Sequence, residues 1–474
     1  GSASLNRLTI DIIAPNAVVT GAINSSGGTV NAGYWNATNT QVGINIPIPS
    51  DNSLQNGNLQ LQADIDGANL FQNIGSDSTI TSTGATHVLT LSAANLTSFG
   101  AVDGNELTFR AVLTDVAGNV TSGSIGANSL IMGTTIPVIV SISSAVVIDT
   151  LGLGESIDID IEFNEALTLT GGTFDITLGT GQTIPISTIN SSSSTSATYT
   201  VAVGEASADL NVTSVSLSAG TLRDMAGNAL VMTLPVGANL ADNNTILVDG
   251  IVPADFATGN ILTVGAPVVT GYWNALNAGL QVILPVTGSD ASLNGGRARL
   301  EARINGNAFE SIGTGSAVGT NPVTLSLSRA QLEADLAGYL AGGTIQVRGV
   351  LTDKAGNATI GSVSTVELII DQVVPTQSVT GDLVVSGGTE IQDYWNPTNT
   401  NLLVSTNLDN DASLLGGHFQ LQMQVGSGSY VAVGPDSVIT AVNTTMEIDL
   451  GVAELNSFAS NDGETIHFRA LLTD

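Results

Sequence analysis

The feature that most constrains this sequence is an acidic loop motif that recurs along it. "LTDVAGN" (113–119) returns as "LRDMAGN" (222–228) and "LTDKAGN" (351–357), and "LLTD" (471–474) repeats its first half. A second motif, "GYWNATNT" (33–40), returns as "GYWNALNA" (271–278) and "DYWNPTNT" (393–400). Internal self-similarity of this kind is the signature of a repeat protein, so we expect several similar units in place of one large domain.

Three of the repeats share one sequence type, A, and the repeat between them has its own pattern, "GESIDIDIEFNEA", which we call type B. Each junction ends in a proline, usually within Asp-x-x-x-Pro. The order is therefore A, B, A, A. The predicted boundaries are 1–14 (the final strand of a preceding or neighbouring unit), 15–136 (A), 137–252 (B), 253–374 (A) and 375–474 (A without its last strand).

The chain is strongly acidic and contains no cysteine. Its 41 acidic residues against 10 basic ones give a formal charge of −31 at neutral pH. Such a polyanion is repelled by nucleic-acid phosphates and attracts cations, so we expect no nucleic-acid partner. Without cysteine, disulfides cannot cross-link the units. No apolar run approaches the roughly 18 residues that a membrane-spanning helix needs, so we expect no membrane insertion.

Strict alternation of apolar and polar residues predicts an all-β chain. It appears in "QVGINIPI", "SIDIDIEF", "ELTFRAVL" and "TIQVRGVL", with turn signals between such runs. Only 92–99, 328–340 and 451–458 look helical, and each precedes the strand that leads into the acidic loop. Units of this length with many short strands predict a tandem array of four immunoglobulin-like β-sandwich domains. Because the linkers are short, we expect an extended rod.

The "D-x-A-G-N" loop together with the Asp-x-x-x-Pro junction resembles the bacterial immunoglobulin-like repeats of large surface adhesins and biofilm-associated proteins. The B repeat, through "IEFNEALTLTGGTFDITLG", is similar to a related calcium-associated repeat of such proteins. The resemblance covers essentially the whole chain. It implies an extracellular location at the bacterial cell surface and calcium at the domain junctions, where the ion fixes the angle between neighbouring repeats.

The residues themselves also suggest calcium sites. In an immunoglobulin-like sandwich the incoming linker and two of the loops lie at the same end, where we expect carboxylates to converge. Converging carboxylates repel one another unless a cation lies among them, and calcium prefers six to eight oxygen ligands. The candidate ligands are Asp11, Asp51, Asp115 and Asn119 in the first repeat; Asp224 and Asn228 in the second, with Asp149 or Glu165; Asp249, Asp290, Asp353 and Asn357 in the third; and Asp371, Asp411 and Asp474 in the fourth.

Simpler interpretations stand beside these. Asp-x-Ala-Gly-Asn is also good turn chemistry, because Asp caps its own loop while Gly and Asn tolerate positive φ. Trp35, Trp273 and Trp395 are expected to pack in the core or at a junction; if exposed, they would instead form a carbohydrate-binding platform. The arginines five residues before the loop aspartates are expected to pair with a neighbouring strand: Arg110, Arg348 and Arg469.

We find no nucleophile motif, no phosphate-binding loop and no acid pair confined to one repeat, so we expect no enzymatic activity. The leading hypothesis is an extracellular stalk of a bacterial adhesin or biofilm-matrix protein, stiffened by calcium at the domain junctions, with calcium and neighbouring repeats of the same protein as its partners. The alternative is a self-assembling filament, in which the strand at 5–12 is donated to the fourth repeat of the next molecule.

Overall fold

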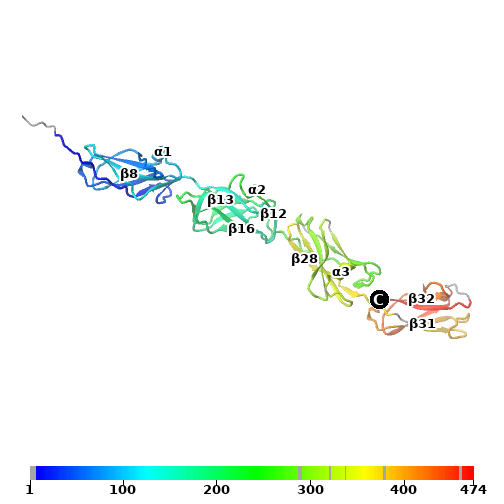
Figure 1. Cartoon of the computed structure of the whole chain (residues 1–474). Helices are drawn as coiled ribbons and strands as arrows, with labels where there is room; N and C mark the ends of the chain where they lie inside the picture. Colours follow the sequence, from blue (N-terminus) through cyan, green and yellow to red (C-terminus); the bar gives the residue numbers. More distant parts are fainter. Residues whose placement is uncertain (1–6, 287–290, 320–321, 337, 377–379, 458–461) are drawn as a thin grey trace, which may run out of the picture. The chain divides into compact units, whose positions relative to one another are not determined.

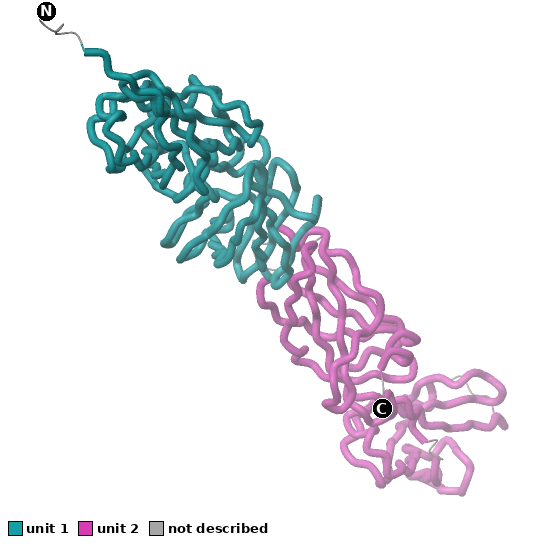
Figure 2. Tube along the Cα trace, turned by 60° about the vertical axis from the view of Figure 1, so that its left-hand side comes forward, with its two compact units in different colours: residues 1–252 teal, residues 253–474 magenta. Residues whose placement is uncertain are grey.

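The structure is a computed structural model of the whole chain, and it describes residues 7–286, 291–319, 322–336, 338–376, 380–457 and 462–474. The chain divides into two compact units, residues 1–252 (unit 1) and 253–474 (unit 2), which Figure 2 colours separately. Each unit contains two hydrophobic cores. We name the predicted repeats 15–136, 137–252, 253–374 and 375–474 domains 1 to 4, so that each unit holds two of them.

Domain 1 folds into two sheets around one core (Figure 1). Its elements are β1 (Ile23–Ser26), β2 (Tyr34–Asn36), β3 (Gln41–Pro47), the 3-10 helix η1 (Asn52–Leu54), β4 (Asn58–Ile65), β5 (Gln72–Asn73), β6 (Ser78–Thr79), β7 (Thr86–Ser92), α1 (Ala93–Phe99), β8 (Glu106–Thr114), β9 (Val120–Ser122) and β10 (Leu130–Gly133). One sheet has the order β1-β3-β7 and the other β2-β10-β8-β4-β5, with β6 beside β4 and β9 beside β8. Alternation in β8 directs Leu107 and Phe109 into the core, as the sequence predicts.

Domain 2 has a different strand arrangement, in keeping with its own sequence type. Its elements are β11 (Ile139–Ser143), β12 (Ile148–Gly152), β13 (Ser156–Thr170), β14 (Phe174–Leu178), β15 (Thr183–Ile186), β16 (Ser192–Thr200), β17 (Ala206–Ser207), β18 (Val212–Leu217), β19 (Thr221–Arg223), α2 (Leu240–Asn243) and β20 (Thr245–Asp249). The sheets have the orders β11-β13-β16, β12-β20-β17 and β15-β14-β18, and β19 pairs with β13. The register of β13 shifts between Glu162 and Leu167, so this long strand serves both β16 and β19.

Domain 3 repeats the plan of domain 1. Its elements are β21 (Ile261–Val264), β22 (Tyr272–Asn274), β23 (Gly279–Leu284), η2 (Ala291–Leu293), β24 (Arg297–Ile304), β25 (Glu310–Ala317), β26 (Val323–Ser328), α3 (Arg329–Asp335), β27 (Thr344–Thr352), β28 (Ala358–Val363) and β29 (Leu368–Asp371). The sheets have the orders β21-β23-β26 and β22-β29-β27-β24-β25, with β28 beside β27. Its core includes Trp273 and Leu332 of α3.

Domain 4 shares this plan in part. Its elements are β30 (Thr380–Ser386), β31 (Asn401–Leu408), η3 (Ala412–Leu414), β32 (His418–Val425), β33 (Val431–Ala432), β34 (Ser437–Val438), β35 (Thr444–Gly451), α4 (Val452–Asn456) and β36 (Ile466–Thr473). One sheet has the order β30-β31-β35, and the other places β33, β34 and β36 beside β32. The prediction of an all-β array of immunoglobulin-like sandwiches is therefore confirmed by sheets of mostly antiparallel strands around separate cores.

The predicted short helices are found before the loop-bearing strands in domains 1, 3 and 4. Helix α1 begins after Ser92, whose hydroxyl accepts a hydrogen bond from the Asn95 amide, and α3 begins after Ser328 in the same way with Gln331. These are capping boxes, in which the side chain at the third helical position bonds back to the cap. Helix α2 in domain 2 was not predicted, because its four residues are too few for a periodic signal.

In domains 1 and 3 the last strand closes the larger sheet. Strand β10 runs parallel to β2 and antiparallel to β8, and β29 lies in the same way between β22 and β27. In domain 4, strand β36, the counterpart of β8 and β27, pairs with β32 alone among the described residues. Phe468 in β36 is only partly buried, whereas its counterpart Phe109 is 1% exposed.

The described part of the predicted N-terminal strand, residues 7–14, forms no strand in this structure. Four of its large apolar side chains are exposed, by 91% at Leu8, 79% at Ile10, 84% at Ile12 and 76% at Ile13. The assignment of this segment as the last strand of another unit therefore stays a prediction.

Candidate calcium sites at the domain junctions

The aspartate of the acidic loop binds groups of its own loop with both carboxylate oxygens. Asp115 is 4% exposed. Its Oδ1 accepts hydrogen bonds from the amides of Ala117 and Asn119, both at 2.9 Å, and its Oδ2 accepts one from Asn119 Nδ2, also at 2.9 Å. The bond from the Asn119 side chain holds the pKa of Asp115 below its usual value. This first loop therefore satisfies its own charge.

The other complete loops repeat this geometry. Asn228 donates to Asp224 through its amide at 2.7 Å and through Nδ2 at 2.6 Å. Asn357 donates to Asp353 through the same two groups at 2.9 and 2.8 Å. The turn chemistry that the sequence suggested is thus present in all three loops. A calcium ion at these aspartates would have to share oxygens that already accept hydrogen bonds.

The loop asparagine also binds the linker that enters its own domain. Asn119 Nδ2 lies 3.3 Å from the carbonyl oxygen of Asp11 and 3.5 Å from that of Ile13. Asn228 Nδ2 donates to the carbonyl oxygens of Gly133 at 2.8 Å and Thr135 at 3.1 Å. Each loop therefore fixes two alternate carbonyls of the incoming chain, and Asp11 occupies the position that Gly133 occupies in the next domain.

The remaining candidate ligands act as local caps in the structure. The linker aspartates Asp11, Asp249 and Asp371 each accept a hydrogen bond from the amide two residues later, at 3.2, 3.1 and 3.1 Å. Asp51 and Asp411 cap η1 and η3 by accepting from the amides of Ser53 and Ser413 at 2.9 and 3.0 Å. Asp290 lies outside the described residues.

Carboxylates nevertheless come close enough to interact at two junctions. In unit 2, burial raises the pKa of Asp474, and the charges of Asp371 and Asp411 raise it further. In unit 1, burial raises the pKa of Glu165 to about 7, with further contributions from the charges of Asp224 and Asp103. A raised carboxyl pKa means that the folded state disfavours the negative charge, which is the electrostatic condition that a bound cation relieves.

Of two further observations, one leaves room for a ligand at these clusters and the other counts against a metal ion in the present arrangement. Glu165 Oε1 is buried and has no hydrogen-bond partner. However, within the described ranges no group of three or more His, Cys, Asp or Glu side chains has an arrangement that could hold a metal ion. The carboxylates interact through their charges without being assembled as a coordination shell, and the calcium assignment stays a prediction.

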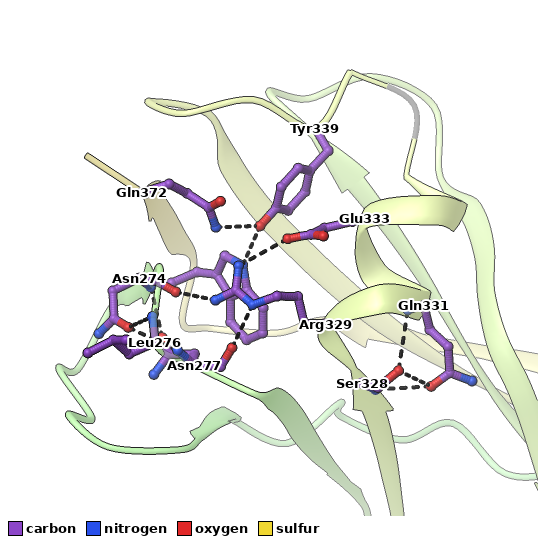
Figure 3. Close-up of polar contacts among 10 residues, drawn as sticks. Asn274, Leu276, Asn277, Ser328, Arg329, Gln331, Glu333, Tyr339 and Gln372 are labelled. Carbon is purple, nitrogen blue, oxygen red and sulfur yellow. Dashed lines mark hydrogen bonds and ion pairs between the residues drawn. The ribbon is translucent and has the colours of Figure 1, made fainter. Parts of the chain in front are cut away.

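The tryptophans lie in or against the cores. Trp35 is 4% exposed and Trp273 is 0% exposed, while Trp395 is partly buried. The indole of Trp273 donates to the Tyr339 hydroxyl, which also accepts from Gln372 Nε2 at 2.7 Å (Figure 3). The guanidinium of Arg329 lies 4.9 Å from the Trp273 ring centroid. The buried rings of Trp35 and Trp273 offer no exposed platform for a sugar.

The arginines before the loops pair across the sheet, as predicted. Arg110 donates to Gln62 at 2.8 Å, and Arg469 donates to Gln422 at 2.7 Å. Arg348 donates to Glu301 at 2.8 Å. Burial favours a higher pKa for the Glu301 carboxyl, but the bonds from Arg348 and Arg299 outweigh it, so the pKa is lowered. Each guanidinium also covers an aromatic ring at 4.0 to 4.2 Å: Phe71, Phe309 and Tyr430. These contacts are structural.

Sequence reasoning overlooked the asparagines of the Tyr-Trp-Asn motif. Asn36 is fully buried at 0% exposed, and Asn39 is 6% exposed. The signal was available, because the spacing Asn-x-x-Asn recurs in all three copies, at 36 and 39, 274 and 277, and 396 and 399.

No family model matches the chain, and no curated protein matches it. Among solved structures, it is similar to one from a 1.5-MDa bacterial ice-binding adhesin (TM-score 0.33, 14% identity, covering 76% of this chain and 100% of that one). It is also similar to the FN1-FN3 domains of chicken CNTN1 (TM-score 0.23, 11% identity, covering 76% and 99%) and to titin domains (TM-score 0.27, 12% identity, covering 74% and 99%). These likenesses are weak and concern the fold alone.

In the described part of the chain, no helix is both long and apolar enough to cross a membrane. The longest helices there, α1 and α3, contain seven residues each.

Proposed function

We propose that this chain is an extracellular, non-catalytic stalk of a bacterial adhesin or biofilm-matrix protein, in which the immunoglobulin-like repeats act as spacers. The observation that carries the proposal is that the loop asparagine binds the backbone of the incoming linker at successive domains. In unit 1, Asn119 and Asn228 bind the linkers that enter domains 1 and 2 through corresponding pairs of carbonyls. A device copied at successive junctions serves the mechanics of the chain, whereas a catalytic site is needed only once.

Calcium at the junctions would complete this role. The raised pKa values of Glu165 and Asp474 and the formal charge of −31 support the proposal. In domain 4 the ligands would be Asp371, Asp411 and Asp474. In domain 2, Asp224 and Glu165 would take part. A bound calcium ion would supply positive charge and draw these oxygens together, since it accepts carboxylate ligands in flexible geometry.

Small-angle X-ray scattering on the full chain tests the stalk and its stiffening together. We expect an elongated particle in calcium that becomes more flexible in EDTA. Calorimetric titration with CaCl₂ should show weaker binding for Asp411→Asn, which keeps the oxygen that caps η3 but removes the charge. Asp160→Asn, an equal charge change on an exposed strand position, is the control. A globular scattering profile would contradict the stalk, and unchanged titration of Asp411→Asn would contradict calcium at that junction.

A second function, filament formation, is favoured by two observations on this chain. Asn119 binds the carbonyls of Asp11 and Ile13 as Asn228 binds those of Gly133 and Thr135. Residues 8–11 therefore occupy the position before domain 1 that β10 occupies before domain 2. The segment also exposes apolar side chains at the positions that β10 buries. Residues 8–11 of one molecule would then lie beside β36 of the next, by strand addition at an open sheet edge.

Sedimentation velocity over a range of concentrations tests this second function. Larger particles should form as the concentration rises, and Ile10→Asp should abolish them, because a carboxylate cannot enter the core of domain 4. Ile10 is 79% exposed in the single chain, so the substitution should not unfold it. Leu70→Asp, at a position that is 69% exposed elsewhere in domain 1, is the matched control. Concentration-independent sedimentation of the unmodified chain would refute filament formation.

A further inference from the structure

The Tyr-Trp-Asn motif of domain 1 forms a rigid polar corner, residues 29–39, which we call the asparagine corner. Asn36 Oδ1 accepts from the Thr38 amide at 2.9 Å and the Thr38 hydroxyl at 2.7 Å. Its Nδ2 donates to the Thr29 carbonyl at 2.7 Å, and its amide donates to Asn39 Oδ1 at 2.8 Å. Because every polar group of Asn36 is fixed, its remaining Nδ2 hydrogen points in one direction.

That direction leads to the acidic loop of domain 2. Asn36 Nδ2 donates to the carbonyl oxygen of Ala226 at 2.9 Å, and the Ala37 amide donates to Asn228 Oδ1, also at 2.9 Å. Asn31 Nδ2 donates to the carbonyl oxygen of Met225. The corner and the loop are about 190 residues apart in sequence. A fourth hydrogen bond, from Arg223 Nη1 to Thr29 Oγ1 at 3.3 Å, joins the same two domains. The three bonds to the loop itself involve no charged group.

The small residues of the loop make this approach possible. A Cβ added at Gly133 would lie 2.4 Å from Ala226 Cβ, so the linker and the loop are already in contact there. Gly227 has a φ of +96°, and a Cβ on it would lie 3.3 Å from Thr29 Cγ2 and 3.4 Å from Asn36 Nδ2. Larger side chains at these places would separate the loop from the corner. The Ala-Gly pair thus serves the contact with the preceding domain as well as the turn.

We propose that the asparagine corner is a docking site for the D-x-A-G-N loop of the domain that follows it, and that the two together form a joint that holds without metal. The inference rests on the proposed stalk function and names the partner of its junctions. Asn228 is central to the joint, because one side chain binds its own Asp224, the linker carbonyls and Ala37 of the preceding domain. This accounts for the loop of domain 2, which follows a type A domain, whereas the loop of domain 3 follows the type B domain, whose sequence has no Tyr-Trp-Asn motif.

The corner is already formed in the other type A domains. The amide of Asn274 donates to Asn277 Oδ1 at 2.8 Å, and that of Asn396 to Asn399 Oδ1 at 2.7 Å. In unit 2 a cavity of about 490 Å³ lies between the corner, at Asn274 and Leu276, and Asp474 of domain 4. Domain 4 has Pro397 where domain 1 has Ala37, so its corner lacks the amide donor for a loop asparagine.

Substitution of Ala37 by proline tests the joint without disturbing the fold of domain 1. It deletes the hydrogen bond to Asn228, and the corner tolerates it because domain 4 carries proline at this place. Asn36→Asp removes the donor to Ala226, and its matched control is Asn396→Asp, where Nδ2 donates only within its own corner, to Thr389. The chain has no cysteine, so spin labels can be attached at Leu70→Cys and Val203→Cys alone, which are exposed positions in domains 1 and 2.

Double electron–electron resonance spectroscopy on the labelled full chain in EDTA then gives the distribution of distances between the spin labels in domains 1 and 2. We expect one narrow distribution, unchanged by calcium, that broadens in Ala37→Pro and Asn36→Asp and stays narrow in Asn396→Asp. Hydrogen exchange at 225–228 should be about 2- to 10-fold faster in Ala37→Pro, as the loss of one hydrogen bond implies. A distribution that is broad in EDTA, or one that is equally narrow in all variants, would overturn the joint while leaving the elongated stalk intact.

Discussion

Replacing Asn228 by alanine should destabilise its domain more than the same change at Asn119, by about 1 kcal/mol. The two asparagines hold the same position in equivalent loops, and each binds its own loop aspartate through amide and side chain. The hydrogen bonds within the loop therefore contribute equally to both losses of stability and drop out of the difference. What remains is the contribution of the junction.

The magnitude follows from the contacts that differ. Asn228 binds its linker carbonyls at 2.8 and 3.1 Å, whereas Asn119 lies 3.3 and 3.5 Å from its own. Asn228 also accepts from the Ala37 amide at 2.9 Å, a bond that has no counterpart at Asn119 in the described part of the chain. One additional hydrogen bond and two shorter ones correspond to about 1 kcal/mol, because each net bond contributes roughly 0.5 to 1.5 kcal/mol.

Hydrogen exchange mass spectrometry along a urea series measures this difference within the full chain. Peptides from the separate cores report domains 1 and 2 independently, which matters because a chain of several domains need not unfold in one step. The midpoint shift multiplied by the urea dependence gives the free-energy change for each core. Equal losses for Asn228→Ala and Asn119→Ala would refute the reasoning, since the joint would then add nothing to the turn.

Three further results are expected. Folding of unit 1 takes up a proton at Glu165, because the pKa of its carboxyl rises from 4.5 to about 7, so the stability present at pH 4.5 declines as the pH rises to 7. Glu165→Gln should remove this loss, which is at most about 3 kcal/mol, in urea unfolding at pH 5 and 8. An unchanged pH profile would contradict this prediction. Tyr339→Phe should destabilise domain 3 by about 1 to 3 kcal/mol, because it leaves the buried Trp273 indole without its hydrogen-bond acceptor. Tyr272→Phe, at a ring that is 40% exposed, should not. Equal unfolding midpoints for the two variants would argue against a stabilising bond between Trp273 and Tyr339. Appending a second copy of residues 354–371 after Asp474 should place a strand beside β36, as β29 lies beside β27, and raise the melting temperature of domain 4 by roughly 5 °C per kcal/mol gained. A blue shift of Trp395 fluorescence is the check, and no shift is the contrary result.

The sequence was sufficient to predict the features that depend on local pattern. Alternation in "ELTFRAVLT" predicts both that Phe109 enters the core and that Arg110 faces a neighbouring strand. The helices α1 and α3 follow from a serine cap and apolar spacing. In each case the determining interactions lie within one element or between adjacent strands, so the order of residues carries the information directly.

The partner of the asparagine corner could not be predicted in this way. The bonds from Asn36 to Ala226 and from Ala37 to Asn228 link places about 190 residues apart, and both motifs are complete local structures without the contact. Which carboxylates converge could be predicted in part, since the charges of Asp371 and Asp411 reach Asp474 as the sequence suggests. Asp51 and Asp411 have the expected position beside the junction, yet in the structure they cap 3-10 helices through the adjacent serines. Side-chain direction, which the sequence does not state, decided both outcomes.

The hydrogen-bonding capacity of asparagine explains why the loop ends in this residue. Its amide group has two donor hydrogens and an acceptor oxygen, so in Asn228 the donors serve Asp224 and the linker while the acceptor serves the preceding domain. Aspartate would place a second carboxylate beside Asp224 and lose the donors, and a hydrophobic residue would leave the Ala37 amide without a partner. The loop aspartate is then needed to orient the asparagine, and alanine and glycine are needed for the approach to the corner. If calcium binds at these junctions, it strengthens a joint that amide hydrogen bonds have already positioned, so chelation should weaken the junction of domains 1 and 2 less than the substitution Asn228→Ala does.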